Sequence, residues 1–264
     1  MSEVLSFHRG DVPLLISVPH DGRNVPPDIR QRMTAAGEAL PDTDWHVAEL
    51  YGFARELGAS MLVANYSRYV VDLNRPASDE ALYNGQVSTG LCPVQTFSGE
   101  DIYRFGAPDD KEVAARIRAF WQPYHDCIEL ELRRMREQHG YALLWDAHSI
   151  NSVVPRLFEG ELPALNIGTN GGLSCGREIE SRVSRIAMES PFEAVLNGRF
   201  QGGFITRHYG DPEKNVHAVQ LEIAQRVYMD EVSDVTDPSK MARLRGTLRQ
   251  MLESLIQEAE KLKV

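Results

Sequence analysis

The sequence lacks the features that mark membrane-spanning proteins, secreted proteins and cysteine-ligated metal proteins. It has no apolar run of about 18 residues, the length that begins to indicate a transmembrane helix. Its first residues, MSEVLSFHRGDVP, contain no basic stretch followed by an apolar core, so no secretory signal is predicted. The cysteines are few, odd in number and form no C-x-x-C pair: Cys92, Cys127 and Cys175. We therefore expect a cytoplasmic protein whose cysteines are small buried apolar side chains.

Positive charge is also scarce in this chain. Its 28 Lys and Arg residues face 38 Asp and Glu residues, which gives a formal net charge of −10. This balance argues against nucleic acid or an anionic membrane as a partner, so we expect neither. An acidic small-molecule substrate would need a local basic pocket. Repeats, low-complexity tracts and linkers are absent too, so we expect a single domain over residues 1–264, while the oligomeric state stays open.

Alternating apolar patterns predict an α/β fold. Strands are predicted at 14–18, 60–67, 69–74, 141–149, 163–169 and 216–225. Helices are predicted at 42–57, 109–138, 175–189 and 238–262, with Pro123 as an expected kink. Residues 76–108 and 198–210 show little periodicity and are predicted to be loops, the longer of which could be a lid. Strands alternating with helices predict a mixed, mostly parallel central sheet with helices on both faces.

Two predicted strands end in a histidine and a carboxylate. The stretch LLISVPHDG runs from a strand into His20 and Asp21, and LLWDAHSI brings Asp146 and His148 to the end of another strand. Open α/β sheets bind ligands at the carboxyl ends of their strands, and imidazole is the commonest metal ligand. Two imidazoles and a carboxylate would hold a divalent cation and leave one position open for water. The sequence predicts such a site on His20 and His148; the alternative is two histidines that only form hydrogen bonds.

The carboxylate ligand is less well defined by the sequence. Asp44, expected near the start of the helix at 42–57, is the preferred choice, and Asp42 and Asp21 are the alternatives. A role as a helix cap would explain Asp44 equally well. Glu49 lies three residues after His46, which gives the H-x-x-E spacing of carboxypeptidase metal sites, although surface positions explain that pair better.

Glu222 is the candidate catalytic group. It lies between Leu221 and Ile223 in the apolar run AVQLEIAQ. A carboxylate in such a run either faces solvent or is buried with a function. In a metal site that function would be general base, accepting a proton from water and passing it to the leaving amine.

Basic residues gather in two further stretches. Arg68 and Arg75 lie at the two ends of the apolar run in YSRYVVDLNRP. The stretch GGFITRHYG holds a second group: Arg207, His208 and Tyr209. Guanidinium groups bind carboxylates through two parallel hydrogen bonds, so these residues are candidates for binding an acidic substrate. The alternative for Arg68 and Arg75 is a structural ion pair, for example with Asp72.

At this point the sequence resembles a known family. The stretches that carry the resemblance are SVPHDG, TDWHVAELYGFA, YSRYVVDLNRP, LLWDAHSI, FQGGFITRHYG and VHAVQLEIAQRVYMDE. Together they are similar to the N-formylglutamate deformylase family, and the likeness runs from about residue 10 to residue 260. The resemblance implies an amidohydrolase of histidine degradation that cleaves N-formyl-L-glutamate to formate and L-glutamate. It also implies the three-layer α/β/α fold of the zinc carboxypeptidases.

The resemblance also implies roles for individual residues. His20 and His148 would be metal ligands, Glu222 the catalytic carboxylate, and Arg68 and Arg75 part of the substrate-binding set. The group of Arg207, His208 and Tyr209 is expected to reach in from a mobile loop. Three residues after His20 comes Arg23, where a carboxypeptidase H-x-x-E motif has glutamate, so the carboxylate ligand would come from elsewhere, with Asp44 preferred.

Several alternatives stay open on the sequence. The metal would be Zn²⁺, with Co²⁺ or Mn²⁺ also compatible with such ligands. The enzyme could instead be a deacylase of another acidic N-acyl amino acid or a small metallopeptidase. A third alternative is a protein that binds an acidic metabolite without catalysis.

Overall fold

The computed structural model describes residues 3–80 and 89–262, and these form a seven-stranded mixed sheet with helices on both faces. The strand order is β1-β3-β2-β4-β7-β5-β6. The strands are β1 (Leu5–His8), β2 (Leu14–Val18), β3 (Ser60–Ala64), β4 (Ala142–Ile150), β5 (Leu165–Gly168), β6 (Ala194–Leu196) and β7 (Val216–Ala224). The β1–β3 and β5–β7 pairs are antiparallel, and all other neighbours are parallel. The predicted mixed, mostly parallel α/β fold is confirmed.

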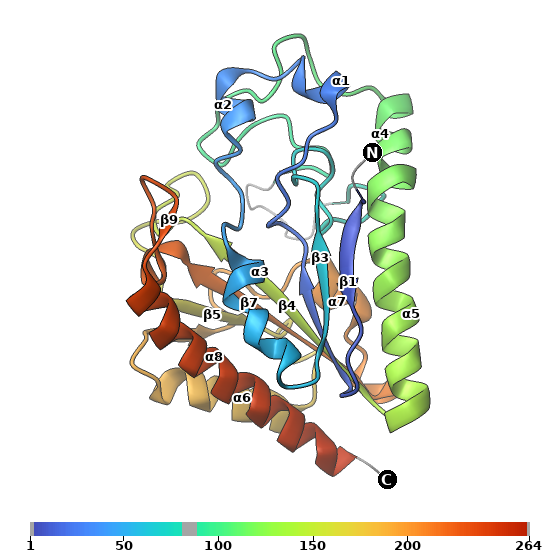
Figure 1. Cartoon of the computed structure of the whole chain (residues 1–264), viewed down its shortest axis with the longest axis vertical. Helices are drawn as coiled ribbons and strands as arrows, with labels where there is room; N and C mark the ends of the chain where they lie inside the picture. Colours follow the sequence, from blue (N-terminus) through green and yellow to red (C-terminus); the bar gives the residue numbers. More distant parts are fainter. Residues whose placement is uncertain (1–2, 81–88, 263–264) are drawn as a thin grey trace.

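Helices cover both faces of the sheet (Figure 1). The helices of the described residues are α1 (Pro27–Arg30), α2 (Ala35–Ala39), α3 (Val47–Leu50), α4 (Asp110–Arg116), α5 (Gln122–His139), α6 (Arg177–Glu189), α7 (Phe204–Tyr209) and α8 (Pro238–Ala259). Of these, α1 and α2 lie above the sheet in this view. The α4–α5 unit lies on one side of the sheet, and α3, α6 and α8 lie on the other. A small hairpin of β8 (Met229–Asp230) and β9 (Val235–Thr236) precedes α8. No helix in residues 3–80 or 89–262 combines the length and apolar character needed to cross a membrane.

Side-chain alternation on the central strands builds two cores. In β2, Leu14 and Ile16 face the layer of α3, α6 and α8, whereas Leu15 faces α5. In β4, Trp145 faces the layer of α3, α6 and α8, and Leu144 faces α5. Because both faces are covered, β2 and β4 are buried at every position, as expected for central strands of a parallel sheet.

Three predicted elements are shorter or broken in the structure. The helix at 42–57 is only α3 and a 3₁₀ turn at Gly52–Arg55, because His46 has a φ of 62°, which a helix cannot contain. The strand at 60–67 ends at Ala64. The helix at 109–138 is divided by a π-helical turn at Ile117–Trp121 just before Pro123, close to the expected kink.

Two other predictions about local structure were wrong. Residues 69–74 form buried turns rather than a strand, because Asp72 accepts hydrogen bonds from the Asn74 main-chain N–H and the Arg68 guanidinium and contacts the distant His20 ring. The predicted loop at 198–210 contains α7. The predicted loop at 76–108 has no helix or strand in its described part, and residues 81–88 lie outside the described residues.

The cysteines follow their prediction only in part. All three are free, and Cys175 is buried. Cys92 and Cys127 are only half-buried, because they lie at the margin of the core between the sheet and α5.

Candidate active site

Three adjacent strands bring the predicted chemical groups to one place. His20 follows the end of β2 by two residues, His148 lies near the end of β4, and Glu222 lies in β7 directly opposite His148 in the parallel register. Asp44 comes from the loop before α3, and its main-chain N–H donates to the His20 carbonyl oxygen. The carboxyl ends of β2, β4 and β7 therefore meet at the site, as the parallel arrangement predicts.

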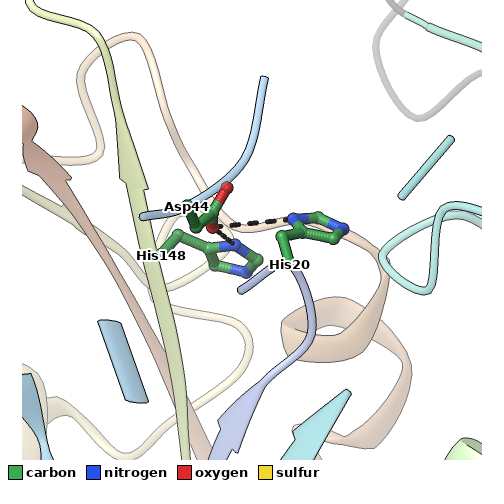
Figure 2. Close-up of side chains that lie close together, drawn as sticks. All are labelled: His20, Asp44 and His148. Carbon is green, nitrogen blue, oxygen red and sulfur yellow. Dashed lines mark hydrogen bonds and ion pairs between the residues drawn. The ribbon is translucent and has the colours of Figure 1, made fainter. Parts of the chain in front are cut away.

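His20, Asp44 and His148 point toward one another (Figure 2). One ligand atom from each lies within 4.8 Å of the other two. The Asp44 Oδ2 atom is 2.9 Å from His148 Nδ1 and 3.6 Å from His20 Nδ1. All three side chains are buried. This set of two imidazole nitrogens and a carboxylate oxygen can hold a divalent metal ion.

Carboxylates at the Nε2 atoms of the two imidazoles fix the orientation of the rings. His20 Nε2 lies 2.8 Å from Asp72 Oδ1, and His148 Nε2 lies 3.1 Å from Asp146 Oδ2. Asp72 accepts the proton of His20 Nε2 and leaves the His20 Nδ1 lone pair on the side of Asp44, as in metal-ligating histidines of other proteins. At His148, the Asn74 amide nitrogen also lies 3.0 Å from Nε2, and Nδ1 lies within hydrogen-bond distance of Asp44 Oδ2. His20 Nδ1 is buried and makes no hydrogen bond within the described residues. The donor set therefore fits a metal ion.

The electrostatics of the group also favour a cation. Burial raises the pKa of Asp44, but His20 and His148 outweigh it and lower that pKa below its usual value. Burial lowers the pKa of His148, but Asp146 and Asp44 outweigh it and raise that pKa well above the usual value. The centre thus stabilises a positive charge, and a proton and a metal ion compete for the same nitrogen.

The other possible carboxylate ligands are engaged elsewhere. Asp42 accepts hydrogen bonds from the Tyr69 hydroxyl at 2.6 Å and the Phe97 main-chain N–H at 2.8 Å. Asp21 accepts from two main-chain N–H groups at the start of α3. Glu49 is exposed and forms an ion pair with Arg245. Of the four, only Asp44 is grouped with both imidazoles.

Glu222 is buried and lines the same cavity as His20, Asp44 and His148. Burial raises its pKa to about 8, and the negative charges of Asp44 and Asp146 act in the same direction. His148 and Arg68 oppose this rise. The solvent-facing alternative for Glu222 does not apply.

Arg68 and Arg75 both line the cavity but differ in their partners. Arg68 is buried and forms ion pairs with Asp72 at 2.8 Å and Asp44 at 3.5 Å, so the structural alternative for this residue is also realised. Arg75 donates from Nε to the Thr89 carbonyl oxygen and from Nη1 to the Asn74 carbonyl oxygen.

The predicted group of Arg207, His208 and Tyr209 lies on α7, and none of the three is among the described residues that line the cavity. Arg207 Nε donates to the Gly202 carbonyl oxygen, and the Tyr209 hydroxyl lies 2.9 Å from His125 Nδ1 on α5. The His208 ring stacks on Phe204. Their role in substrate binding stays a prediction.

Sequence reasoning missed other residues at the site. They are Asp72 as a partner of His20, the neighbouring Asn74, and the cavity-lining residues Phe97, Arg199 and Phe200. Asp72 and Asn74 lie in the stretch DLNR, where two polar residues within an apolar run were the available signal. Arg199 lies in a loop without a distinctive pattern, and no local signal identifies it.

Comparisons with known proteins agree with this geometry. A family model for N-formylglutamate amidohydrolase matches residues 12–229. The chain is 49% identical to the N-formylglutamate deformylase of Pseudomonas putida and 52% identical to that of Pseudomonas aeruginosa, over 97% of both chains in each case. It shares the fold of N-formylglutamate amidohydrolase from Ralstonia eutropha JMP134, with a TM-score of 0.82, 20% identity and 97% of each chain covered. The resemblance seen in the sequence is confirmed: the chain belongs to the N-formylglutamate amidohydrolase family.

Proposed function

We propose that this protein is an N-formylglutamate deformylase of histidine degradation, which hydrolyses N-formyl-L-glutamate to formate and L-glutamate. The observation that carries the proposal is the buried group of His20, Asp44 and His148 beside Glu222, in a cavity that arginine side chains line. The names of the two Pseudomonas relatives support the choice of substrate.

The proposal includes a divalent metal ion held by His20, Asp44 and His148, with Zn²⁺ as the first candidate and Co²⁺ or Mn²⁺ as the alternatives. When bound, such an ion polarises an amide carbonyl and lowers the pKa of water from 15.7 toward about 7. Asp72 keeps the proton of His20 on Nε2, so that His20 Nδ1 is available as a ligand, and Asp146 orients the His148 ring.

Glu222 moves the protons of the reaction. A cation at the neighbouring ligands would favour its ionised form, against the burial that raises its pKa. As a carboxylate it accepts a proton from the attacking water at an Oε atom. It then gives that proton to the glutamate nitrogen as the C–N bond breaks, so that the amine leaves in neutral form.

The substrate carries two carboxylates, and the cavity supplies cationic groups for them. Arg75 can bind a carboxylate through a forked pair of hydrogen bonds. Arg68 is already neutralised by Asp72 and Asp44, so its place beside the metal ligands suits stabilisation of the developing oxyanion. We also propose a cytoplasmic location, which the free cysteines support.

The test measures formate release from N-formyl-L-glutamate by protein whose metal content is known from elemental analysis. Acetate release from N-acetyl-L-glutamate and cleavage of a dipeptide with C-terminal glutamate are measured in parallel. We expect formate release to dominate, to disappear on chelation and to return with added Zn²⁺, Co²⁺ or Mn²⁺. Preferred acetate or peptide cleavage would favour the deacylase or peptidase, and binding without turnover would favour the non-catalytic alternative.

A further inference from the structure

The cavity lining includes apolar residues on and near β4, in addition to the polar candidate metal ligands. Ile150 follows His148 by two residues on the same side of the strand, about 6.6 Å farther along. Ile150, Leu157 and Phe200 line this part of the cavity and belong to one apolar cluster. Arg199 lines the cavity next to them. The cavity that holds the candidate metal ligands is therefore also lined by an apolar surface and by the guanidinium of Arg199 beside it.

The orientation of Arg199 is fixed by its neighbours. Its Nε donates to the Leu157 carbonyl oxygen at 2.8 Å, and its guanidinium lies over the Phe200 ring at 5.4 Å from the centroid. These contacts hold the guanidinium plane against the apolar surface. A guanidinium fixed in this way binds a carboxylate with little further loss of side-chain entropy.

We propose that Arg199 binds the side-chain carboxylate of the substrate and sets the preference for an acidic over a neutral side chain; this inference rests on the proposed function. A glutamate side chain has two methylene groups and then a carboxylate, which matches an apolar surface with Arg199 beside it. The other two cavity arginines are less suited to this end of the substrate. Arg68 is paired with acids, and Arg75 follows Asn74, whose amide nitrogen lies 3.0 Å from His148 Nε2. Arg75 therefore belongs to the end that holds the α-carboxylate, next to the amide bond.

The experiment compares kcat/KM for N-formyl-L-glutamate and N-formyl-L-glutamine, which have the same shape but differ in side-chain charge. In Arg199→Gln we expect the value for N-formyl-L-glutamate to fall about 10- to 100-fold, while the value for N-formyl-L-glutamine changes about 3-fold or less. Arg199→Lys keeps the charge without the fork and should lose part of the preference. If Arg199→Gln does not fold, the ratio of the two kcat/KM values in Arg199→Lys tests the inference instead.

Arg156→Gln is the matched control. Arg156 also ties loops together, donating to the Thr96 carbonyl oxygen at 2.9 Å and to Gln95 Oε1 at 2.8 Å, but it is not among the described residues that line the cavity. This variant should keep the wild-type ratio. If both substrates lose equally in the Arg199 variants, or neither loses, Arg199 is only a structural tie and the inference is wrong.

A binding measurement separates this inference from the proposed function. We expect L-glutamate to raise the Tm of the wild type more than L-glutamine does, and this difference to vanish in Arg199→Gln. A wild type that releases no formate would overturn the proposed function, and the Tm difference would still decide whether Arg199 recognises an acid. An equal Tm difference in wild type and variant would overturn the role of Arg199.

Discussion

The candidate metal site and the cavity arginines are held in place by different parts of the fold. His148 and Glu222 lie within β4 and β7, and His20 closely follows β2; these strands are adjacent in the sheet. Arg75 and Arg199 lie outside helices and strands. Each donates from Nε to a main-chain carbonyl oxygen: Arg75 to Thr89 of the same β3–α4 connection, and Arg199 to Leu157 of the β4–β5 connection.

The groups proposed for the chemistry therefore lie on or next to the sheet, and the groups proposed for substrate selection lie in loops. The sheet ladder fixes the groups that would hold a metal ion, for which small displacements are costly. Loops carry the arginines that we propose select the substrate, and loops can change without disturbing the sheet. The segment that holds Arg75 is braced from α5 and the π-helical turn: Trp121 Nε1 donates to the Arg75 carbonyl oxygen, and His125 Nε2 donates to the Leu73 carbonyl oxygen, each at 2.9 Å.

The largest effect is expected at Glu222. Glu222→Gln removes the proton acceptor and donor while keeping the shape, so kcat should fall about 10²- to 10⁴-fold. KM should change little, because the metal ligands and arginines remain. Glu131→Gln is the control, a buried glutamate that bonds Ser60 and Arg134 and does not line the cavity; it should keep wild-type kcat. Wild-type turnover in Glu222→Gln would remove the assignment of the base.

The metal centre is tested by a pair of aspartates two residues apart. Asp44→Asn should weaken Zn²⁺ binding by about 100-fold or more, because it replaces a charged ligand with a neutral one, and even second-shell changes cost about 10- to 100-fold. Asp42→Asn should bind Zn²⁺ normally, since Asp42 bonds Tyr69 and Phe97 instead. Competition with a chromophoric chelator measures both affinities. The reverse result would make Asp42 the ligand.

The same division explains what the sequence could predict. His20, His148 and Glu222 were accessible because an apolar run that ends in, or contains, a polar residue is a local signal. The start of α7 could not be predicted from the sequence. It depends on the hydrogen bond that the Ile205 main-chain N–H donates to Asn74 Oδ1, a partner 131 residues away. The choice between Asp44 and Asp42 likewise depended on Tyr69 and Phe97, and no local spacing reveals such distant contacts.

Arg75→Lys should have a smaller effect than the changes at the metal centre. Lysine keeps the charge but cannot make the forked pair, so we expect kcat/KM to fall about 10-fold. The loss should be equal for N-formyl-L-glutamate and N-formyl-L-glutamine, because both carry the α-carboxylate. Steady-state kinetics with the two substrates measure this. Unchanged kinetics would make Arg75 a structural residue, and a loss confined to N-formyl-L-glutamate would exchange its role with that of Arg199.

The smallest effect on activity at neutral pH is expected at His125, which braces the loop side of the cavity. Burial lowers the pKa of His125 from 6.5 to about 3, although its bond to the Leu73 carbonyl oxygen opposes this. Above about pH 6.5 the residue is neutral in both folded and unfolded chains and does not affect the pH dependence. Below that pH the unfolded chain binds a proton that the folded chain excludes, so stability falls as the pH is lowered toward 3. At pH 5 this amounts to about 2 kcal/mol.

His125→Gln removes this titration while glutamine can still donate to the Leu73 carbonyl oxygen. The variant should therefore lose about 2 kcal/mol less unfolding free energy than the wild type between pH 7 and pH 5. Urea unfolding at the two pH values measures the difference. Equal losses in both proteins would mean that His125 accepts its proton without leaving its site between α5 and the segment of Arg75. The His125 ring would then be more accessible to water than its stacking on Trp121 and its contact with the Tyr209 hydroxyl indicate.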